Sequence, residues 1–283
     1  MTFRVVSPAS IDYPDSLNSL GDDRPPQLFV LGDASHLSQP TVAIVGTRDA
    51  TPYGTRVTRT LASAFASAGV SVVSGMARGI DAVAHRAALD SGGRTVAVLG
   101  TGVDVPYPVG HRELHAGISE RGCVISEYGS GVGAHRGTFP KRNRIIAALA
   151  PLTIVVEAGH KSGALITAGF AASLNRSVAA VPGPIDSPQS EGSNQLLRDG
   201  AHVIASVADA LALLGLPAPG QRASIHLSEN DARVWESLVS GPLLPDEIAA
   251  ATNLATRDCL AAITSLELDG SVEVLLTGEV RRR

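Results

Sequence analysis

The sequence predicts an α/β fold: a doubly wound, mostly parallel sheet with helices on both faces, followed by a small C-terminal domain. Three observations support this. Between Thr41 and about Leu214, short β-branched runs alternate with alanine-rich segments of helical periodicity. The runs are apolar on both faces, which is typical of parallel strands that helices cover on both sides. Near Leu216 the composition changes to a stretch rich in proline and glycine, which indicates a linker.

The predicted strands are short and evenly spread along the first three quarters of the chain. They lie at residues 42–45, 70–73, 95–99, 124–126, 153–156, 178–181 and 202–204. Strands that alternate with helical segments form βαβ units, whose strands run parallel. We therefore expect these seven segments to share one sheet.

Two of the segments between strands carry clear signals for the start and end of a helix. Thr51 followed by Pro52 is the pattern of a capping residue and a proline at the first helical position, and Gly69 is placed to end that helix. Apolar residues recur between them at helical spacing: Val57, Leu61, Phe65 and Ala68. A second helix is expected over about residues 80–91, before a pair of glycines.

These patterns divide the chain into four parts. Residues 1–40 are too short and too rich in proline for a domain of their own, and we expect them to lead as an extension into an α/β domain over residues 41–215. Residues 216–224 have the composition of a linker. Residues 225–283 resemble a winged helix, with three helices and a short hairpin: helices at about 229–240, 245–252 and 256–269, and a strand at 272–276.

Composition excludes several classes of protein. With 44% hydrophobic residues and a net charge of only −4 the chain is not of the disordered class, and it has no overall basic field, so a polyanion site must be local. The longest apolar stretch, residues 145–156, is broken by Pro151, and no membrane partner is expected. The N-terminus lacks the apolar region of a signal peptide, and the two cysteines form no disulfide framework, so we expect a cytoplasmic location. Cys123 and Cys259 are both expected to be packed in the interior.

Small and polar residues follow the predicted strands at their carboxyl ends. They are Gly46, Thr47 and Arg48 after the first strand, Ser74 and Gly75 after the second, and Ser162 and Gly163 after the fifth. In open α/β sheets, ligands bind beyond the carboxyl ends of the strands, where helix N-termini offer unpaired N–H groups. The pattern predicts a groove for a polyanion, although any single glycine is equally consistent with a tight strand-to-helix turn.

One ten-residue stretch concentrates basic residues. Residues 135–144 contain His135, Arg136, Lys141, Arg142 and Arg144, with Phe139 and Asn143 among them. Cations can bind phosphates, an aromatic ring can stack on a base and an amide can hydrogen-bond, which together suit a single nucleic-acid strand. The alternative is a solvated loop with a core phenylalanine.

Several motifs occur in a fixed order along residues 12–205. They are DYPDSL (12–17), VAIVGTR (42–48), SGMARGIDAVAH (74–85), FPKRNR (139–144), SGALITA (162–168) and VPG (181–183). This ordered set resembles the DNA-processing protein A family, DprA or Smf.

The resemblance implies an extended Rossmann-like domain that binds single-stranded DNA and loads the recombinase RecA onto it. The family is known from natural transformation, in which incoming DNA is protected during uptake and handed to homologous recombination. It implies a homodimer and no catalytic residue, cofactor or metal. The DNA-binding residues implied by the matching motifs are Gly46, Thr47, Arg48, Ser74, Gly75, Phe139, Lys141, Arg142, Asn143, Ser162 and Gly163. Among these, we expect Arg48 and Lys141 to contact phosphates and Phe139 to stack on a base.

The tail resembles the winged-helix domain that many members of the family carry, but its charge is unusual for a reader of duplex DNA. Residues 225–283 contain ten acidic and five basic residues, and the expected recognition helix offers Arg257 as its only cation. We therefore expect this domain to contact protein, or to be a mere appendage, rather than to grip a duplex.

A second hypothesis is a nucleotide-processing enzyme. Rossmann-like pockets such as those of the cytokinin-activating phosphoribohydrolases use glycine-rich turns and a glutamate for N-glycosidic hydrolysis, and Glu157 or Glu127 could supply that acid. The chain lacks a PGGxGT-type loop and contains FPKRNR, which disfavours this hypothesis. It also lacks the GxxxxGK[ST] loop of ATPase motors.

Three histidines invite other interpretations. His111 and His115 could lie on one helix face and hold a metal, but no third ligand is evident and we favour a surface helix. His85 could cap its helix or pair with Asp81, and we expect a structural role.

Overall fold

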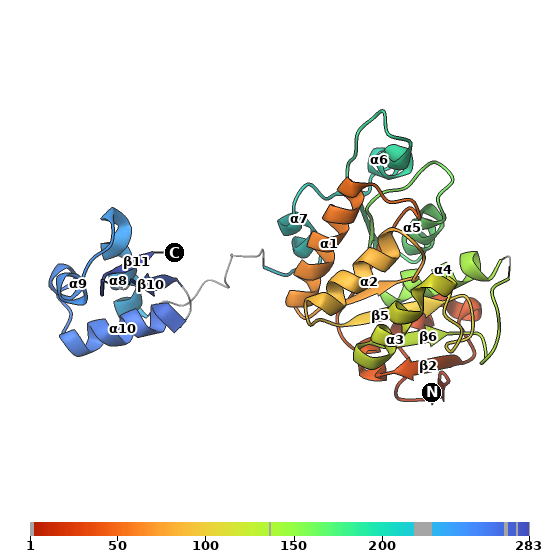
Figure 1. The fold of residues 1–283 in the computed structure, drawn as a ribbon, viewed down its shortest axis with the longest axis horizontal. Coiled ribbons are helices and arrows are strands. Elements are labelled where there is room, and N and C mark those ends of the chain that lie inside the picture. The colour runs from red at the N-terminus through yellow and green to blue at the C-terminus, as the bar shows by residue number, and fades with distance from the viewer. Residues whose placement is uncertain (1–2, 136, 218–227, 269–270, 276, 283) are drawn as a thin grey trace. The chain divides into compact units, whose positions relative to one another are not determined.

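The structure is a computed structural model of the 283-residue chain that describes residues 3–135, 137–217, 228–268, 271–275 and 277–282. The chain divides into two compact units, residues 1–220 and 221–283, each described here by itself (Figure 1). The linker predicted over residues 216–224 lies mostly outside the described residues. In the described part of the chain, no helix is both long enough and apolar enough to cross a membrane.

The described residues of the first unit form a nine-stranded sheet in the order β1-β2-β6-β5-β4-β3-β7-β8-β9. The strands are β1 (Arg4–Val6), β2 (Leu28–Gly32), β3 (Thr41–Val45), β4 (Ser71–Ser74), β5 (Thr95–Leu99), β6 (Cys123–Ser126), β7 (Leu152–Val155), β8 (Ser177–Ala180) and β9 (His202–Val203). Strands β3 to β9 pair in parallel. The order reverses between β3 and β7, so the doubly wound fold class predicted from the sequence is confirmed, and the reversal is its switch point.

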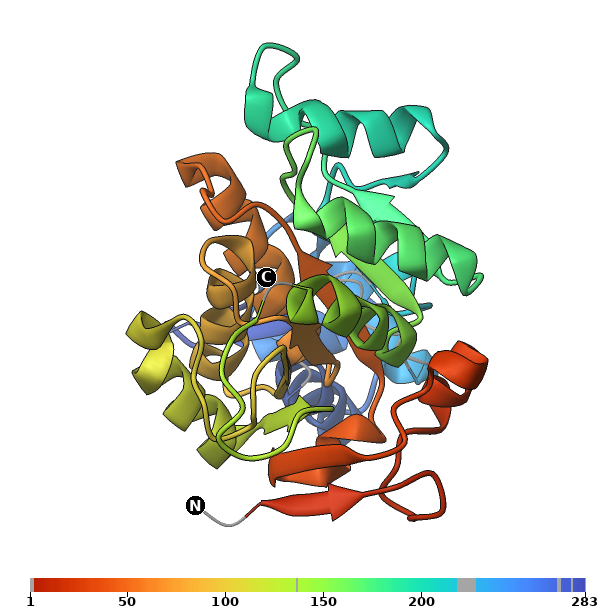
Figure 2. The ribbon, with the colours of Figure 1, turned by 90° about the vertical axis from the view of Figure 1, so that its right-hand side faces the viewer.

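The first 40 residues extend this sheet, which the sequence patterns did not predict. Strand β2 pairs antiparallel with β6, and β1 pairs antiparallel with β2. Between β2 and β3 lies the 3-10 segment η2 (Ala34–Leu37), and between β1 and β2 lies η1 (Asp15–Asp23), whose Leu17 is fully buried. Figure 2 shows these red strands at one end of the sheet and helix α6 at the other.

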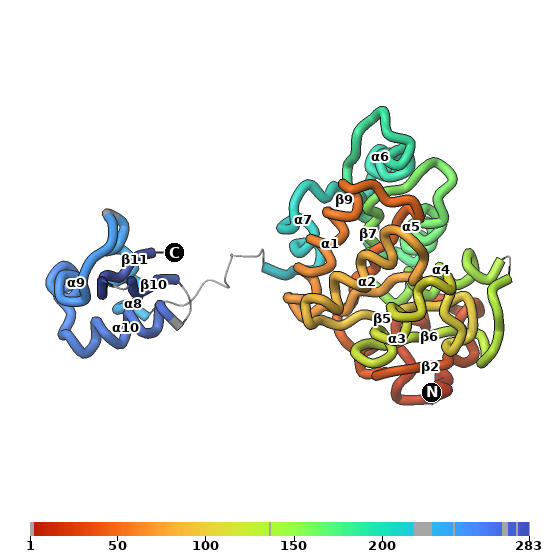
Figure 3. The backbone as a smooth tube through the Cα atoms, viewed as in Figure 1, coloured from red at the N-terminus to blue at the C-terminus, as the bar shows by residue number. Residues whose placement is uncertain are grey.

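Helices cover both faces of the sheet. They are α1 (Pro52–Ser67), α2 (Ile80–Asp90), α3 (Arg112–Arg121), α4 (Thr138–Leu149), α5 (Gly163–Ser173), α6 (Glu191–Arg198) and α7 (Val207–Ala212), with 3-10 turns η3 (Val109–His111) and η4 (Pro188–Ser190). The apolar side chains of α1, α2, α3 and α7 pack on one face. Those of η1, α4 and α5 pack on the other. Figure 3 traces the chain through these crossovers.

The start and end of α1 follow the signals in the sequence. The Thr51 hydroxyl accepts a hydrogen bond from the Gly54 N–H at 3.1 Å, and Pro52 occupies the first turn. Gly69 follows the C-cap with φ +77°, a conformation that glycine adopts without the cost other residues pay. Both predictions for this helix are confirmed.

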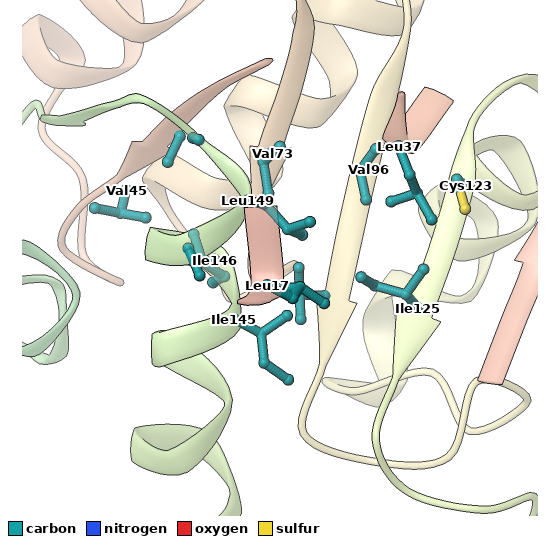
Figure 4. Packing of buried hydrophobic residues seen from close by; sticks show 14 of the residues in the cluster. Leu17, Leu37, Val45, Val73, Val96, Cys123, Ile125, Ile145, Ile146 and Leu149 are labelled. Atoms are coloured by element: carbon teal, nitrogen blue, oxygen red, sulfur yellow. The ribbon is translucent and has the colours of Figure 1, made fainter. Parts of the chain in front are cut away.

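One core lies between α4 and the sheet. Figure 4 shows Ile145, Ile146 and Leu149 of α4 gathered with Leu17 over strand residues of this cluster. Cys123 at the start of β6 belongs to the same core and is fully buried, as predicted. Burial raises the pKa of its thiol to about 12, so it is inert as a nucleophile.

The second unit has the fold expected of a winged helix. Its elements are α8 (Glu229–Ser237), η5 (Leu238–Ser240), α9 (Pro245–Thr252), α10 (Thr256–Leu268) and the antiparallel strands β10 (Val272–Val274) and β11 (Val280–Arg282). Its core joins all three helices and both strands through Val234, Ile248, Leu266, Val272 and Val280. Cys259 is buried in this core, so the prediction of a packing role is confirmed.

Candidate nucleic-acid interface

A cavity of about 510 Å³ opens where the sheet order reverses, beyond the carboxyl ends of β3 and β7. This volume lies within the usual range of ligand pockets. Eight of the residues singled out from the sequence line it: Gly46, Thr47, Arg48, Phe139, Arg142, Asn143, Ser162 and Gly163. Residues that are far apart in the chain are therefore brought to one site at the edge predicted for a polyanion.

The turn after β3 is held in place by the neighbouring strand and helix. The Thr47 N–H donates to the Glu157 carbonyl at 2.7 Å, and the Thr47 carbonyl accepts from the Ile80 N–H at 3.2 Å. A Cβ at position 46 would lie 2.5 Å from Ile80 Cγ1, so the close packing of this turn requires glycine at 46. The result is a rigid turn that presents Arg48 at the cavity.

One side of the cavity is built to attract anions. Arg48 and Lys161 line it as exposed side chains, and neither forms a salt bridge in the described part of the chain. Ser162 caps α5, its hydroxyl accepting from the Ala164 N–H at 3.3 Å. No atom would meet a Cβ at Gly163 within 4 Å, so the first turn of α5 is open. A helix N-terminus beside two cations is a favourable place for a phosphate.

Phe139, in the first turn of α4, supplies an aromatic surface at the cavity. Its ring lies against the backbone at Gly100, where an added Cβ would come 3.0 Å from Cδ1. It also packs against Tyr107, with ring centroids 4.9 Å apart and a tilt of 34°. The side chain is half-buried rather than enclosed in the core, so the alternative of a core phenylalanine is wrong.

Arg142 lies at the floor of the cavity and is used inside the protein. Its Nη1 donates to the carbonyls of Gly75, at 2.8 Å, and of Val98. A Cβ at position 75 would lie 2.6 Å from Nη2, so Gly75 leaves the room that the guanidinium needs. Burial lowers the pKa of Arg142 to about 10 in spite of the charge of Asp81 nearby.

Asp81 faces Arg142 from the start of α2. Its Oδ2 accepts from the Gly75 N–H at 3.1 Å and from the Ala77 N–H at 3.4 Å. Burial raises the pKa of its carboxyl, while the Arg142 charge and these hydrogen bonds act in the opposite direction. Together, the buried Asp81 and Arg142 side chains hold the loop after β4 and the strand β5 beneath the cavity.

Three more of the singled-out residues have different surroundings. Asn143 is nearly buried at the cavity and donates from Nδ2 to the Gly163 carbonyl at 3.2 Å, which ties α4 to α5. Ser74 is buried outside the cavity and donates to the Ile44 carbonyl at 2.6 Å. Lys141 also lies outside the cavity lining; it is 61% exposed and 3.6 Å from the Glu127 carboxylate.

The sequence reasoning missed His160 and Lys161, which line the cavity. A usable sign was present, since the chain contains two lysines and the second one directly precedes the Ser162-Gly163 turn. Arg136, which the sequence grouped with the basic stretch, lies outside the described residues.

Neither of the two glutamates considered as catalytic acids lines the cavity. Glu157 is buried, and its carboxylate accepts from the Thr51 N–H at 3.0 Å and from the Thr51 hydroxyl. Glu127 accepts two hydrogen bonds from Arg144, at 2.9 and 2.8 Å. Burial raises the pKa of the Glu127 carboxyl, but hydrogen bonds and charge from Arg144 outweigh it and hold the pKa below its usual range. Both carboxylates are therefore engaged in holding the fold.

His111 and His115, considered above as metal ligands, each bind a separate backbone carbonyl. His111 Nδ1 lies 3.0 Å from the Met76 carbonyl, and His115 Nε2 lies 2.7 Å from the Val103 carbonyl. The expectation of a surface helix is wrong for His115, which is buried because α3 packs on the sheet through that face. Among the described residues, no group of three or more metal-ligating side chains is present.

His85 is fully buried on α2 and, in place of the suggested pairing with Asp81, contacts Thr95. Thr95 Oγ1 donates to the Val72 carbonyl at 2.6 Å and therefore accepts from His85 Nδ1–H, also at 2.6 Å. The neutral ring leaves Nε2 buried without a partner among the described residues. Burial, aided by the Arg142 charge, lowers the pKa of His85 to about 3.

This histidine makes the stability of the α/β domain pH-dependent. Because the folded pKa lies below the unfolded value of 6.5, the unfolded chain binds the proton first, and stability falls as the pH drops from about 6.5 towards 3. His85→Asn keeps a donor for Thr95 and cannot titrate, so we expect it to remove up to about 1.4 kcal/mol per pH unit from the slope. Urea unfolding between pH 4 and 8 measures this, with exposed His202→Asn as control; equal slopes in wild type and His85→Asn would contradict it.

The winged-helix unit uses its terminal arginines internally. The Arg282 guanidinium lies 4.2 Å from the centroid of the Trp235 ring and donates from Nε to the Trp235 carbonyl at 2.9 Å. Arg281 forms an ion pair with Glu273. These contacts leave this unit without a described basic cluster for gripping a duplex.

Together, these features define a class: a doubly wound α/β protein with a cavity at the switch point of its sheet, lined by exposed cations and an aromatic ring. The comparison with known proteins gives the family. The family model described as DNA recombination-mediator protein A matches residues 4–215, and the DprA winged helix domain matches residues 217–275. The chain therefore belongs to the DprA family.

Relatives support this membership along most of the chain. A putative DNA processing protein DprA from Mycobacterium tuberculosis is 44% identical over 257 residues, which is 87% of this chain and 66%, just under two thirds, of that protein. Protein Smf from Synechocystis is 37% identical over 307 residues, covering 94% of this chain and 77% of that protein.

Two solved structures share the fold of the α/β unit. The X-ray structure of DNA processing protein A from Streptococcus pneumoniae has a TM-score of 0.72 and 40% identity, covering 75% of this chain and 74% of that chain. The second is a structure of DNA processing protein A from Helicobacter pylori, reported for the single-stranded DNA binding mode of that protein. It has a TM-score of 0.69 and 30% identity, covering 76% of this chain and 96% of that chain.

Proposed function

We propose that this chain binds single-stranded DNA in the switch-point cavity and acts as a recombination mediator that protects the strand and loads RecA onto it. The observation that carries this proposal is the combination at one cavity of Arg48, Lys161, the open N-terminus of α5 and Phe139. Cations and helix N–H groups suit phosphates, and the ring suits a base of any identity.

The remaining site residues have roles that support this binding surface. Gly46, Thr47, Gly75 and Arg142 set the shape and rigidity of the floor, while Ser162, Gly163 and Asn143 position the start of α5. Lys141 is exposed next to the cavity wall formed by Phe139 and Pro140. We assign it a contact with the next phosphate of the strand, just outside the cavity. Ser74 contributes indirectly, because its hydrogen bond to the Ile44 carbonyl fixes the end of β4 beneath the cavity.

Family membership adds the wider setting of the proposal. The family description names a DNA recombination mediator, and the H. pylori relative binds single-stranded DNA, so we assign the same ligand to this chain. Action as a homodimer in the cytoplasm, without catalytic chemistry or a cofactor, completes the proposal. Light scattering of the purified chain tests the dimer, and strand exchange by RecA on DNA coated with a single-strand-binding protein tests the loading.

The deciding experiment is fluorescence-anisotropy titration of the whole chain with labelled single-stranded and duplex oligonucleotides of equal length. We expect tighter binding of the single strand, little dependence on base identity and, with about three phosphate contacts, a log–log salt slope of roughly −2. Equal binding of both forms would refute the proposal. A parallel incubation with nucleoside monophosphates tests the enzyme hypothesis. Release of free base would favour an enzyme of N-glycosidic hydrolysis over the proposed function.

A further inference from the structure

Tyr107 is an aromatic side chain that the motifs did not single out. All ten aromatic residues of the chain are described, and Tyr107, with 41% of its surface accessible, is the most exposed of them. Its hydroxyl has no hydrogen-bond partner among the described residues, so the fold makes no use of its polar end. Its ring packs on Phe139, the ring that lines the cavity.

The loop that carries Tyr107 is firmly held. Thr101 Oγ1 donates to the Val105 carbonyl at 2.7 Å, and the Gly102 N–H donates to the Val132 carbonyl at 2.8 Å. The Asp104 carboxylate accepts from the Ser130 hydroxyl at 2.6 Å and from the Gly131 N–H at 3.0 Å. An exposed ring on an ordered loop loses little freedom on binding, so it is well prepared as a stacking surface.

Tyr107 is also placed on the course that a strand would take along the sheet edge. Its loop follows β5, whereas Phe139, Arg48 and Lys161 surround the cavity beyond β3 and β7, and β4 lies between β5 and β3. Tyr107 is not part of the cavity lining, so a base that contacts it lies outside the cavity, beyond Phe139. The tilted contact between the two rings makes their apolar surfaces continuous.

We propose that Tyr107 and Phe139 form a two-ring platform that takes two neighbouring bases of the strand, one against Phe139 in the cavity and the next against the outer side of Tyr107. This inference rests on the proposed function, since it extends the same binding site by one nucleotide. It makes Tyr107 a DNA-contacting residue rather than a support for Phe139 alone.

The test compares Tyr107→Ala, Tyr107→Phe and the wild type on two ligands of equal length and charge, an oligothymidine and an oligomer of abasic sites. We expect Tyr107→Ala to weaken thymidine binding by about tenfold, with no change on the abasic oligomer, because the lost contact is with a base. Tyr107→Phe should bind within about twofold of wild type, since the ring is kept. Val109→Ala, which removes a nearby exposed apolar side chain, is the matched control.

Cross-linking with 5-iodouracil separates direct contact from support of Phe139. An oligothymidine with one iodouracil, moved one position at a time, should give an adduct at Tyr107 from the position next to the one that gives an adduct at Phe139. An adduct at Phe139 without one at Tyr107, unchanged binding by Tyr107→Ala, or an equal loss on both oligomers would overturn the inference. If the wild type binds no single strand at all, the proposed function itself has failed.

Discussion

Replacing Arg48 with alanine is expected to weaken binding of every single-stranded oligonucleotide by about tenfold, whatever its sequence. Arg48 lines the cavity and has no salt-bridge partner in the described part of the chain, so its charge is available to a phosphate. A charge-assisted hydrogen bond of about 1.5 kcal/mol corresponds to this loss. Anisotropy titrations across a salt series should also give a log–log slope that is flatter by about 0.7, the share of one phosphate contact.

Two further variants make this prediction specific. Lys141→Ala should cause a smaller loss, because Lys141 already interacts with Glu127 and lies outside the cavity lining. Arg59→Ala removes an exposed arginine of α1 that is not part of the cavity and should leave both affinity and slope unchanged. An Arg48→Ala protein with the wild-type salt slope would remove Arg48 from the proposed phosphate contacts.

Replacing Arg144 with methionine is expected to destabilise the α/β domain by about 3–5 kcal/mol. Arg144 and Glu127 are each only 7% exposed, and the guanidinium also donates to the Asp23 carbonyl at 3.0 Å, which fastens η1 to α4. Removal of the arginine leaves the buried Glu127 carboxylate with the exposed Lys141, 3.6 Å away, as its remaining described cation, and takes a side-chain donor from the Asp23 carbonyl. Because the folded pKa of Glu127 lies below its unfolded value, the stabilisation is present at neutral pH and is lost as the pH falls through the folded pKa.

Circular dichroism during urea unfolding measures this loss. Trp235 is the single tryptophan of the chain and lies in the winged-helix unit, so its fluorescence reports that unit separately. Arg4→Met is the matched control, since the Arg4–Asp12 pair at 3.4 Å is largely exposed and is worth less than about 1 kcal/mol. A loss in Arg144→Met no larger than in Arg4→Met would show that the buried pair contributes little.

The sequence was most informative where burial forces a simple pattern. The strands from β3 to β8 are covered on both sides and are therefore mostly apolar on both faces, which made them recognisable. The strands β1 and β2 have no such pattern that would identify them from the surrounding sequence. β1 is three residues long and mostly exposed, and β2 is fixed by its pairing with β6, some 95 residues later, which no local pattern encodes.

At the candidate site, the turn residues could be predicted, but the division of labour among the basic residues could not. Lys141 and Arg142 are adjacent in sequence, and successive residues on a helix point about 100° apart. One is therefore exposed beside the cavity, and the other is buried beneath it with its charge directed at Asp81 and backbone carbonyls. Lys161 lies in a loop that has no periodic pattern, so its position directly before the N-cap of α5 was the one sign in the sequence that it belongs to the site.

The antiparallel addition of β2 to β6 has a consequence for how the chain folds as it is made. Residues 28–32 are synthesised well before their partner strand, which ends at Ser126. At common rates of translation, about 5–20 residues per second, the apolar side chains of β2 wait roughly 5–20 s for the strand that covers them. During that time Leu28 and Val30, both fully enclosed in the finished domain, are open to any chaperone at the ribosome exit.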